Sequence, residues 1–298
     1  MANAREIQSR MKSIKDTMKI TNAMYMISSS KLKKAKKNLA DTEPYFYAMQ
    51  GEISRILRHV PDIENKYFDS RQQIKDDDRK VGYIVVTADK GLAGSYNHNV
   101  FKEVEDAMAE SKNNKLFVVG EMGRHYFEKK GVEIAHQFHY TAQNPSVSRA
   151  RAISELLIED FLEHDLDEVV MVYTRMLNSM QVETERIKLL PLGKNEFNTV
   201  KIPAGVRREE LVLSPSADDV INSIIPNYVQ GFIYGALVES FSSEQNLRMM
   251  AMEAATSSAQ AMLRDLSIQY NRVRQAAITQ EITEVVAGAK AQKKKKKR

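Results

Sequence analysis

Residues 87–97, with the sequence TADKGLAGSYN, come closest in this chain to a phosphate-binding pattern. They place Gly91 and Gly94 directly after an apolar run, and turns of this kind can hold phosphate at a helix N-terminus. The spacing matches neither the dinucleotide fingerprint nor the Gly-x-x-x-x-Gly-Lys-Ser/Thr loop of nucleotide hydrolases. Two interpretations therefore remain open, a nucleotide site and a tight connection between a strand and a helix.

Candidate metal ligands and nucleophiles are sparse. His136 and His139 are the only closely spaced histidine pair, and no cysteine or obvious carboxylate completes a ligand set with them. No arrangement of Ser, His and Asp stands out. We therefore expect no catalytic residue, no metal and no cofactor. With no cysteine in the chain, disulfides and thiol switches are excluded.

Positive charge is concentrated in two short runs, although the net charge is only +5. One run is SKLKKAKK at residues 30–37, and the other is the tail at residues 293–298. Lysines neutralise nucleic-acid phosphates without reading sequence, but no aromatic or Arg-rich base-reading set accompanies them. The run at 30–37 therefore indicates a solvated helix face, an acidic protein partner or, as the alternative, a coiled-coil protein that binds nucleic acid. For the tail we expect a solvated segment.

Long helices are the elements expected to position these groups at both ends of the chain. Residues 2–60 contain one proline and one glycine, Pro44 and Gly51. Apolar or small residues recur there at alternating spacings of four and three, the repeat of a coiled coil. Several of them bury little surface, so this seam alone predicts a weak dimer. The seam residues are Ile7, Met11, Ile14, Met18, Thr21, Tyr25, Ser28, Leu32, Ala35 and Leu39.

The C-terminal part repeats the pattern. Ser216, followed by Asp218 and Asp219, predicts a helix N-cap, and Pro226 is a potential kink or break. Residues 236–287 contain neither proline nor glycine. The two seams are most simply paired with each other as an antiparallel coiled coil, although periodicity does not exclude pairing between two chains. The second seam comprises Met249, Met252, Thr256, Ala259, Leu263, Leu266, Tyr270, Val273 and Ala277.

The middle of the chain predicts an α/β domain. GYIVVT, KLFVVG and EVVMVY are continuous apolar runs of strand length, which is typical of a mostly parallel sheet covered on both faces. Helical stretches near residues 99–109, 121–130 and 148–163 alternate with them, so the fold class is α/β and Rossmann-like, and VETERIKLLPL is typical of an edge strand. The expected segments are 1–60, a linker at 61–80, the domain at 81–192, a connector at 193–215, the helix at 216–289 and the tail at 290–298. No run approaches the roughly 18 to 20 apolar residues of a membrane-spanning helix.

Five motifs resemble those of the gamma subunit of bacterial F-type ATP synthases. KITNAMYMISSSKLKKA at 19–35 and ITQEITEVVAGA at 278–289 are similar to the terminal signatures of that family. DKGLAGSYN, SEQNLRMMAMEAAT and YNRVRQAAITQE also match, so the resemblance runs in order along nearly the whole chain. It departs from the family in the tail after Ala289. The absence of cysteine favours a bacterial type over plastid relatives, which carry a cysteine-bearing regulatory insertion.

The resemblance implies a rotor shaft. In the family, the paired terminal helices stand inside a ring of three α and three β subunits, and the α/β domain sits beside ε and the membrane c-ring. Proton-driven rotation then drives ATP synthesis on β, reversibly, and the subunit itself is not catalytic. The implied place is the cytoplasmic face of the cell membrane, without membrane insertion or nucleic acid.

The resemblance also implies contact residues for β. Met24 and the adjacent basic helix, Lys31, Lys33 and Lys34, would face an acidic lever on β. Near the tip, Arg274, Gln275, Thr279 and Glu281 would contact β, the first three at a loop that catches the shaft. Arg248 would belong to the region of the helix pair that couples these contacts. Judged without the resemblance, the polar members of this set are expected to be exposed.

Overall fold

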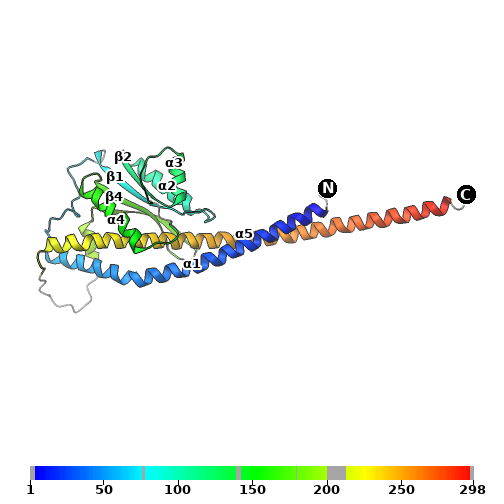
Figure 1. Ribbon diagram of the computed structural model, residues 1–298, viewed down its shortest axis with the longest axis horizontal. Helices are drawn as coiled ribbons and strands as arrows, with labels where there is room; N and C mark the ends of the chain where they lie inside the picture. Colours follow the sequence, from blue (N-terminus) through cyan, green and yellow to red (C-terminus); the bar gives the residue numbers. More distant parts are fainter. Residues whose placement is uncertain (1–3, 76–77, 139–141, 179, 200–212, 296–298) are drawn as a thin grey trace. The chain divides into compact units, whose positions relative to one another are not determined.

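The computed structural model describes residues 4–75, 78–138, 142–178, 180–199 and 213–295 (Figure 1). Two compact units emerge, one formed by Met1–Ile27 with Met249–Arg298 and the other by Ser28–Arg248. We call them the coil unit and the domain unit. Their boundaries cut through both terminal helices, whereas the sequence segments follow changes of periodicity, so the segment boundaries stay a prediction.

The two long helices are present. Helix α1 spans Ala4–His59 and α5 spans Ala217–Lys295, with Pro44 and Pro226 inside them. Ser216 caps α5 as expected, because its Oγ accepts a hydrogen bond from the Asp219 N–H at 3.1 Å and donates one to the Asp219 carboxylate at 2.6 Å. Helix α5 continues through Pro226 although proline removes one backbone hydrogen bond. Ile225 and Val229 on either side are completely buried, and this packing holds the helix in place.

The domain unit contains a five-stranded sheet in the order β3-β2-β1-β4-β5. The strands are β1 (Lys80–Val86), β2 (Asn113–Val119), β3 (Ile134–Phe138), β4 (Glu168–Met176) and β5 (Val182–Leu190). Strand β1 pairs in parallel with β2 and β4, β2 pairs in parallel with β3, and β5 runs antiparallel to β4 at one edge. The mostly parallel sheet and the edge strand are confirmed.

Helices cover both faces of this sheet. Helices α2 (Tyr96–Ala109) and α3 (Glu121–Lys129) share one apolar cluster with side chains such as Val85, Val118 and Val172. Helix α4 (Val147–Leu162) and parts of α1 and α5 share the other cluster with Ile84, Phe117 and their neighbours. Alternating residues of one strand therefore enter different cores, which explains why these strands read as continuous apolar runs.

Strand β3 was not predicted from the sequence. Its sequence, IAHQF, is short and carries polar residues, so neither an apolar run nor a clear alternation marks it. It forms because β2 offers a free edge, to which it pairs in parallel with a register shift. The short 3-10 helix η2 covers Lys194–Thr199. Most of the expected connector at 193–215, the end of the tail and His139 lie outside the described residues.

The coil unit is held by the expected seam. Every seam position of α1 from Ile7 to Tyr25 is at least partly buried, as is every seam position of α5 from Met249 to Val273. Thr21 and Thr256 meet across the pair, with their hydroxyls 2.7 Å apart. Because the helices are antiparallel and Thr21 lies opposite Thr256, Ala4 at the start of α1 lies at the level of Val273 on α5. The seam prediction is wrong for Ala277, which is exposed because α1 offers it no partner.

Candidate functional site

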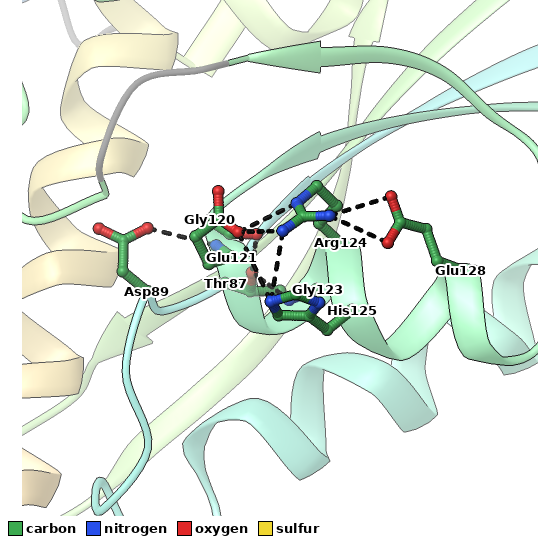
Figure 2. A network of polar contacts seen from close by, with 8 residues as sticks. All are labelled: Thr87, Asp89, Gly120, Glu121, Gly123, Arg124, His125 and Glu128. Carbon is green, nitrogen blue, oxygen red and sulfur yellow. Dashed lines mark hydrogen bonds and ion pairs between the residues drawn. The ribbon is translucent and has the colours of Figure 1, made fainter.

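The turn after β1 uses its polar groups inside the protein. Acceptor groups of residues 87–89 receive hydrogen bonds from three backbone N–H groups at the start of α3. The Asp89 carboxylate accepts from the N–H of Glu121 at 3.3 Å, the Ala88 carbonyl accepts from Met122 at 2.9 Å, and the Thr87 hydroxyl accepts from Gly123 at 3.0 Å. Figure 2 shows two of these contacts beside Arg124, which pairs with Glu121 and Glu128 on the same helix. The start of the turn is thus used to hold α3 against the end of β1, so the connection interpretation is favoured.

Close packing of the backbone reinforces this arrangement. Gly120 has φ of +101°, and a Cβ built there would lie 2.2 Å from the Thr87 carbonyl oxygen. A Cβ at Gly123 would lie 2.7 Å from the Thr87 hydroxyl oxygen. Both glycines therefore allow α3 to approach the end of β1 directly, which leaves no room for a ligand at this point.

The crevice beside this turn is filled by α5. In doubly wound α/β folds, ligands bind at the carboxyl ends of the strands where the strand order reverses, here between β1 and β4. At the end of β4, the Thr174 N–H donates to Ser240 Oγ at 3.1 Å, and Ser243 Oγ donates to the Thr174 carbonyl at 3.2 Å. Tyr96, which is 1% exposed, lies at the end of β1 and donates from its hydroxyl to the Val86 carbonyl at 3.5 Å. Helix α5 therefore occupies the crevice in which related folds bind a ligand.

Arg248 fastens α5 to the same turn. Its guanidinium pairs with Glu244 one turn earlier and donates to the carbonyls of Lys90 and Gly91 at 3.0 and 3.1 Å. The side chains of Arg248 and Glu244 are 9% and 2% exposed. Burial raises the pKa of Glu244, and the adjacent Arg248 opposes that shift. The expectation of an exposed Arg248 is wrong, because the domain covers this side of α5 in a way that helix periodicity does not reveal.

The predicted contact residues of α1 differ in exposure. Lys33 and Lys34 are exposed, whereas Lys31 is half-buried and lies near enough to Glu244 to lower the pKa of that carboxyl. Lys31 and Arg248 therefore share one acidic neighbour inside the domain unit. Met24 is half-buried in the coil unit.

The far end of α5 is bare. Arg274, Gln275, Thr279 and Glu281 are exposed, as is every residue from 274 to 290. This stretch also exposes apolar side chains, including Ile282 at 59% and Val285 at 72%. Met24 lies near the level of Thr256, so Arg274 is roughly 30 Å further along α5 at about 1.5 Å per residue. Met24 and the predicted tip residues therefore lie at separate places along the coil unit.

The histidines give no metal site in the part of the chain that the structure describes. His136 lies on β3 against Phe138, with ring centroids 4.7 Å apart. Within the described residues, no three His, Cys, Asp or Glu side chains are grouped so that they could hold a metal ion. Over the same residues, no helix is both long enough and apolar enough to cross a membrane.

Sequence reasoning missed four charged residues that lie inside the domain unit. Glu239 and Glu244 lie in the most buried part of α5, and Arg71 forms a buried ion pair with Asp167 at 2.8 Å. One available signal was the spacing of Glu244 and Arg248, which places them on one helix face. Another was a glutamate inside the apolar run that precedes Phe241.

Comparisons with known proteins point in one direction. A family model described as ATP synthase matches residues 3–292. A protein of Ruminiclostridium cellulolyticum called ATP synthase gamma chain is 44% identical, covering 97% of this chain and 98% of its own. One of Acetobacterium woodii, called ATP synthase gamma chain, sodium ion specific, is 37% identical over 97% of this chain and 98% of its own.

Solved structures share the fold. The chain resembles one in the mitochondrial ATP synthase central stalk and c-ring of Tetrahymena thermophila, with a TM-score of 0.58 at 24% identity, covering 79% of this chain and 99% of that one. It also resembles a chain of the Euglena gracilis mitochondrial ATP synthase, with a TM-score of 0.57 at 15% identity, covering 93% and 97%. These likenesses support the architecture of a sheet domain with long terminal helices.

Proposed function

This chain belongs to the ATP synthase gamma chain family, and we propose on that premise that it is the central-stalk rotor of an F1Fo ATP synthase. It would couple rotation of a membrane c-ring to conformational change in the catalytic β subunits during ATP synthesis, and in reverse during hydrolysis. Catalysis would reside in the ring of three α and three β subunits, with ε as a further partner. The complex would place the chain peripherally at the cytoplasmic face of the membrane.

The observation that carries the proposal is the full-length match to gamma chains combined with the bare end of α5. Exposed apolar side chains such as Ile282 and Val285 on one helix favour burial against another protein. Small seam residues such as Thr21 and Ala259 keep the helix pair thin enough to turn inside a protein sleeve. The solved structures with this fold include an ATP synthase central stalk with its c-ring and an ATP synthase in one of its rotational states, which fits this role.

Two contact regions would transmit torque. Met24, Lys31, Lys33 and Lys34 would meet a lever on β, while Arg274, Gln275, Thr279 and Glu281 would meet β nearer the tip. Arg248 would act differently, because it is buried and bonded to the Lys90–Gly91 turn. Its part in coupling would be to keep α5 fixed to the domain while force passes along the helix.

A truncation that follows the end of helix pairing tests the shaft. Removal of residues 274–298 leaves every paired seam residue in place, so the chain is expected to fold and assemble with cognate α and β, with the complex weakened. We expect proton-driven ATP synthesis in reconstituted vesicles to fall at least tenfold, because the tip contacts are lost. Removal of residues 290–298 alone is the matched control, and it is expected to leave synthesis within about twofold.

Unchanged proton-driven synthesis after removal of residues 274–298 would refute the shaft role. A nucleotide enzyme predicts a different result, namely tight ATP binding by the isolated chain that is lost on Lys90→Ala. A nucleic-acid-binding coiled coil predicts salt-sensitive DNA binding without ATP synthase subunits. The packing of α3 against the end of β1 and the filled crevice beside β4 give no support to the nucleotide alternative.

A further inference from the structure

A pocket of about 250 Å³ lies in the domain unit between α1, α5 and the end of β4. It is distinct from the exposed helix end and from the filled crevice. Aromatic rings form much of its wall, from Phe46, Tyr47, Tyr173, Tyr228 and Phe232. Tyr173 and Phe232 meet edge to face at 6.4 Å between centroids. Rings of this kind attract cations through their faces.

One carboxylate oxygen in this pocket has no hydrogen-bond partner among the described residues. It is the buried Oε2 atom of Glu239. Burial raises the pKa of Glu239 to about 7, while Arg175 opposes the shift and Glu185 and Glu43 add to it. A buried oxygen without a donor is costly and is ordinarily satisfied by water or a ligand.

The charges around Glu239 favour a cation. Glu43 and Tyr47 face it from α1, Arg175 from β4 and Glu185 from β5. Arg175 is already paired with Glu185 at 2.6 Å. Glu43 and Glu239 line the pocket, and Glu185 lies close enough to act on Glu239, so three carboxylates stand against the one guanidinium of Arg175 and leave an excess of negative charge beside the rings.

Two glycines on α5 shape the space. A Cβ at Gly231 would collide with the Phe46 ring at 1.6 Å, so this glycine lets Phe46 lie directly on the helix. A Cβ at Gly235 would meet nothing within 4 Å, so this position faces open space in the pocket wall. The pocket is thus bounded by Phe46 and open at Gly235, with Glu239 one turn further along α5.

We propose that this pocket binds a small organic ammonium ion, with the aromatic rings around its apolar part and the Glu239 carboxylate accepting a hydrogen bond from its nitrogen. A charge-assisted hydrogen bond of this kind is stronger than a neutral one. The ring-lined wall excludes a strongly hydrated metal ion, which would need several oxygen ligands. All residues of this pocket belong to the domain unit, and none is among the predicted contacts with β. The proposed binding can therefore be tested separately from the rotor role.

The test uses the full chain and two probes that differ only in the polar group. 2-Phenylethylammonium and 2-phenylethanol are titrated at pH 8, and binding is followed through the NMR signals of labelled tyrosine rings. We expect the ammonium to bind with a Kd on the order of 1 mM. The alcohol is expected to bind at least tenfold more weakly, since it carries no charge.

Two variants locate the site. Glu239→Gln keeps the shape and removes the charge, so ammonium affinity is expected to fall at least tenfold. Gly235→Leu fills the pocket and favours the helix, so binding of both probes is expected to disappear. Gly288→Leu is the matched control, because it adds the same side chain to α5 at another open position, and it is expected to bind like the unaltered chain.

The pH response separates Glu239 from the rings. Ammonium affinity is expected to fall about tenfold from pH 8 to pH 6 as Glu239 takes up a proton, and to stay constant in Glu239→Gln. Equal binding of the alcohol and the ammonium would overturn the proposal. So would undiminished ammonium binding by either Glu239→Gln or Gly235→Leu, or no binding by the unaltered chain at 10-fold above the expected Kd, about 10 mM.

Discussion

Helices α1 and α5 pass through two environments, and the contrast shows what each part is built to do. In the domain unit they lie against a sheet, and Ile53, Ile225 and Val229 are completely buried. Over the described residues of the coil unit, each helix packs against the other alone, and seam residues such as Met11 and Leu263 remain partly exposed. Beyond Val273, α5 has no partner among the described residues.

The two units differ in how strongly they hold α1 and α5 in place. Burial contributes about 25 cal/mol per Å² of apolar surface, so the domain unit holds its helices far more strongly than a thin seam does. Polar anchors add to this hold, since Ser240, Ser243 and Arg248 bond to the ends of the sheet. In the coil unit, by contrast, the surface of α5 from residue 274 to residue 290 is exposed and could be covered by another protein.

The largest test of the contrast replaces one core residue in each unit. Phe117→Ala in the domain unit is expected to cost about 3 to 5 kcal/mol, because Phe117 is 1% exposed. Leu266→Ala in the coil unit is expected to cost about 2 kcal/mol, since one helix alone covers it. Amide hydrogen exchange resolved along the chain measures both losses. Met262→Ala, on the exposed side of α5, is the control, and equal losses at Phe117 and Leu266 would remove the distinction.

The buried ion pair between Arg71 and Asp167 makes the stability of the domain unit depend on pH at low pH. Burial alone would raise the pKa of Asp167, but bonds from the Lys80 N–H and Arg71 outweigh it and lower the pKa. The folded form therefore favours the ionised carboxylate, and this stability is present above the unfolded pKa of about 4 and lost as pH falls through the lower folded value. Arg71→Ala is expected to cost about 3 kcal/mol at pH 7, because it leaves Asp167 buried without its partner.

Urea unfolding of Asp167→Asn provides the measurement of this pH dependence. The stability difference between the unaltered chain and this variant is expected to shrink from pH 7 to about pH 2, as the native carboxylate takes up its proton. A difference that stays constant over that range would contradict the role of ionised Asp167. Asp106, which is exposed on α2, is the matched position, and Asp106→Asn is expected to change little.

Glu239 is expected to change stability with pH by less than Asp167 and in the opposite direction. Its pKa is raised to about 7 by burial, so the folded chain favours the protonated form. That stability is fully present below the unfolded pKa of about 4.5 and is lost as pH rises through 7. We expect Glu239→Gln to gain stability relative to the unaltered chain between pH 5 and pH 8, measured as the shift in Tm. Glu43→Gln, at the exposed rim, is expected to show almost no such trend.

The smallest expected effect lies in the coil seam. A double-mutant cycle of Thr21→Ala and Thr256→Ala is expected to give a coupling of about 0.5 kcal/mol, because the hydroxyls form one partly buried hydrogen bond. Hydrogen exchange is expected to rise in residues 4–27 while the sheet strands keep their protection. A coupling as large as the loss at Phe117 would mean that the seam is held as firmly as the domain.

Much of the fold was predictable because its signals are local. The seams at Ile7–Tyr25 and Met249–Val273, the cap at Ser216 and the apolar strands each depend on residues near in sequence. Strand β3 was not predictable, since a neighbouring strand rather than its own pattern makes IAHQF extended. Of the candidate site, Arg274, Gln275, Thr279 and Glu281 are exposed as expected, whereas Arg248 is buried.

The sequence by itself therefore determined the long helices, the strands, their alternation and the family, since periodicity and motifs are carried by the chain. Only the tertiary structure decided that residues 87–89 accept hydrogen bonds from α3 and that α5 fills the crevice beside β4. It also decided that helix pairing ends at Val273 and that Glu239 faces a pocket. These outcomes depend on which distant segments pack together, because burial and hydrogen-bond partners belong to neighbours in space rather than to neighbours in sequence.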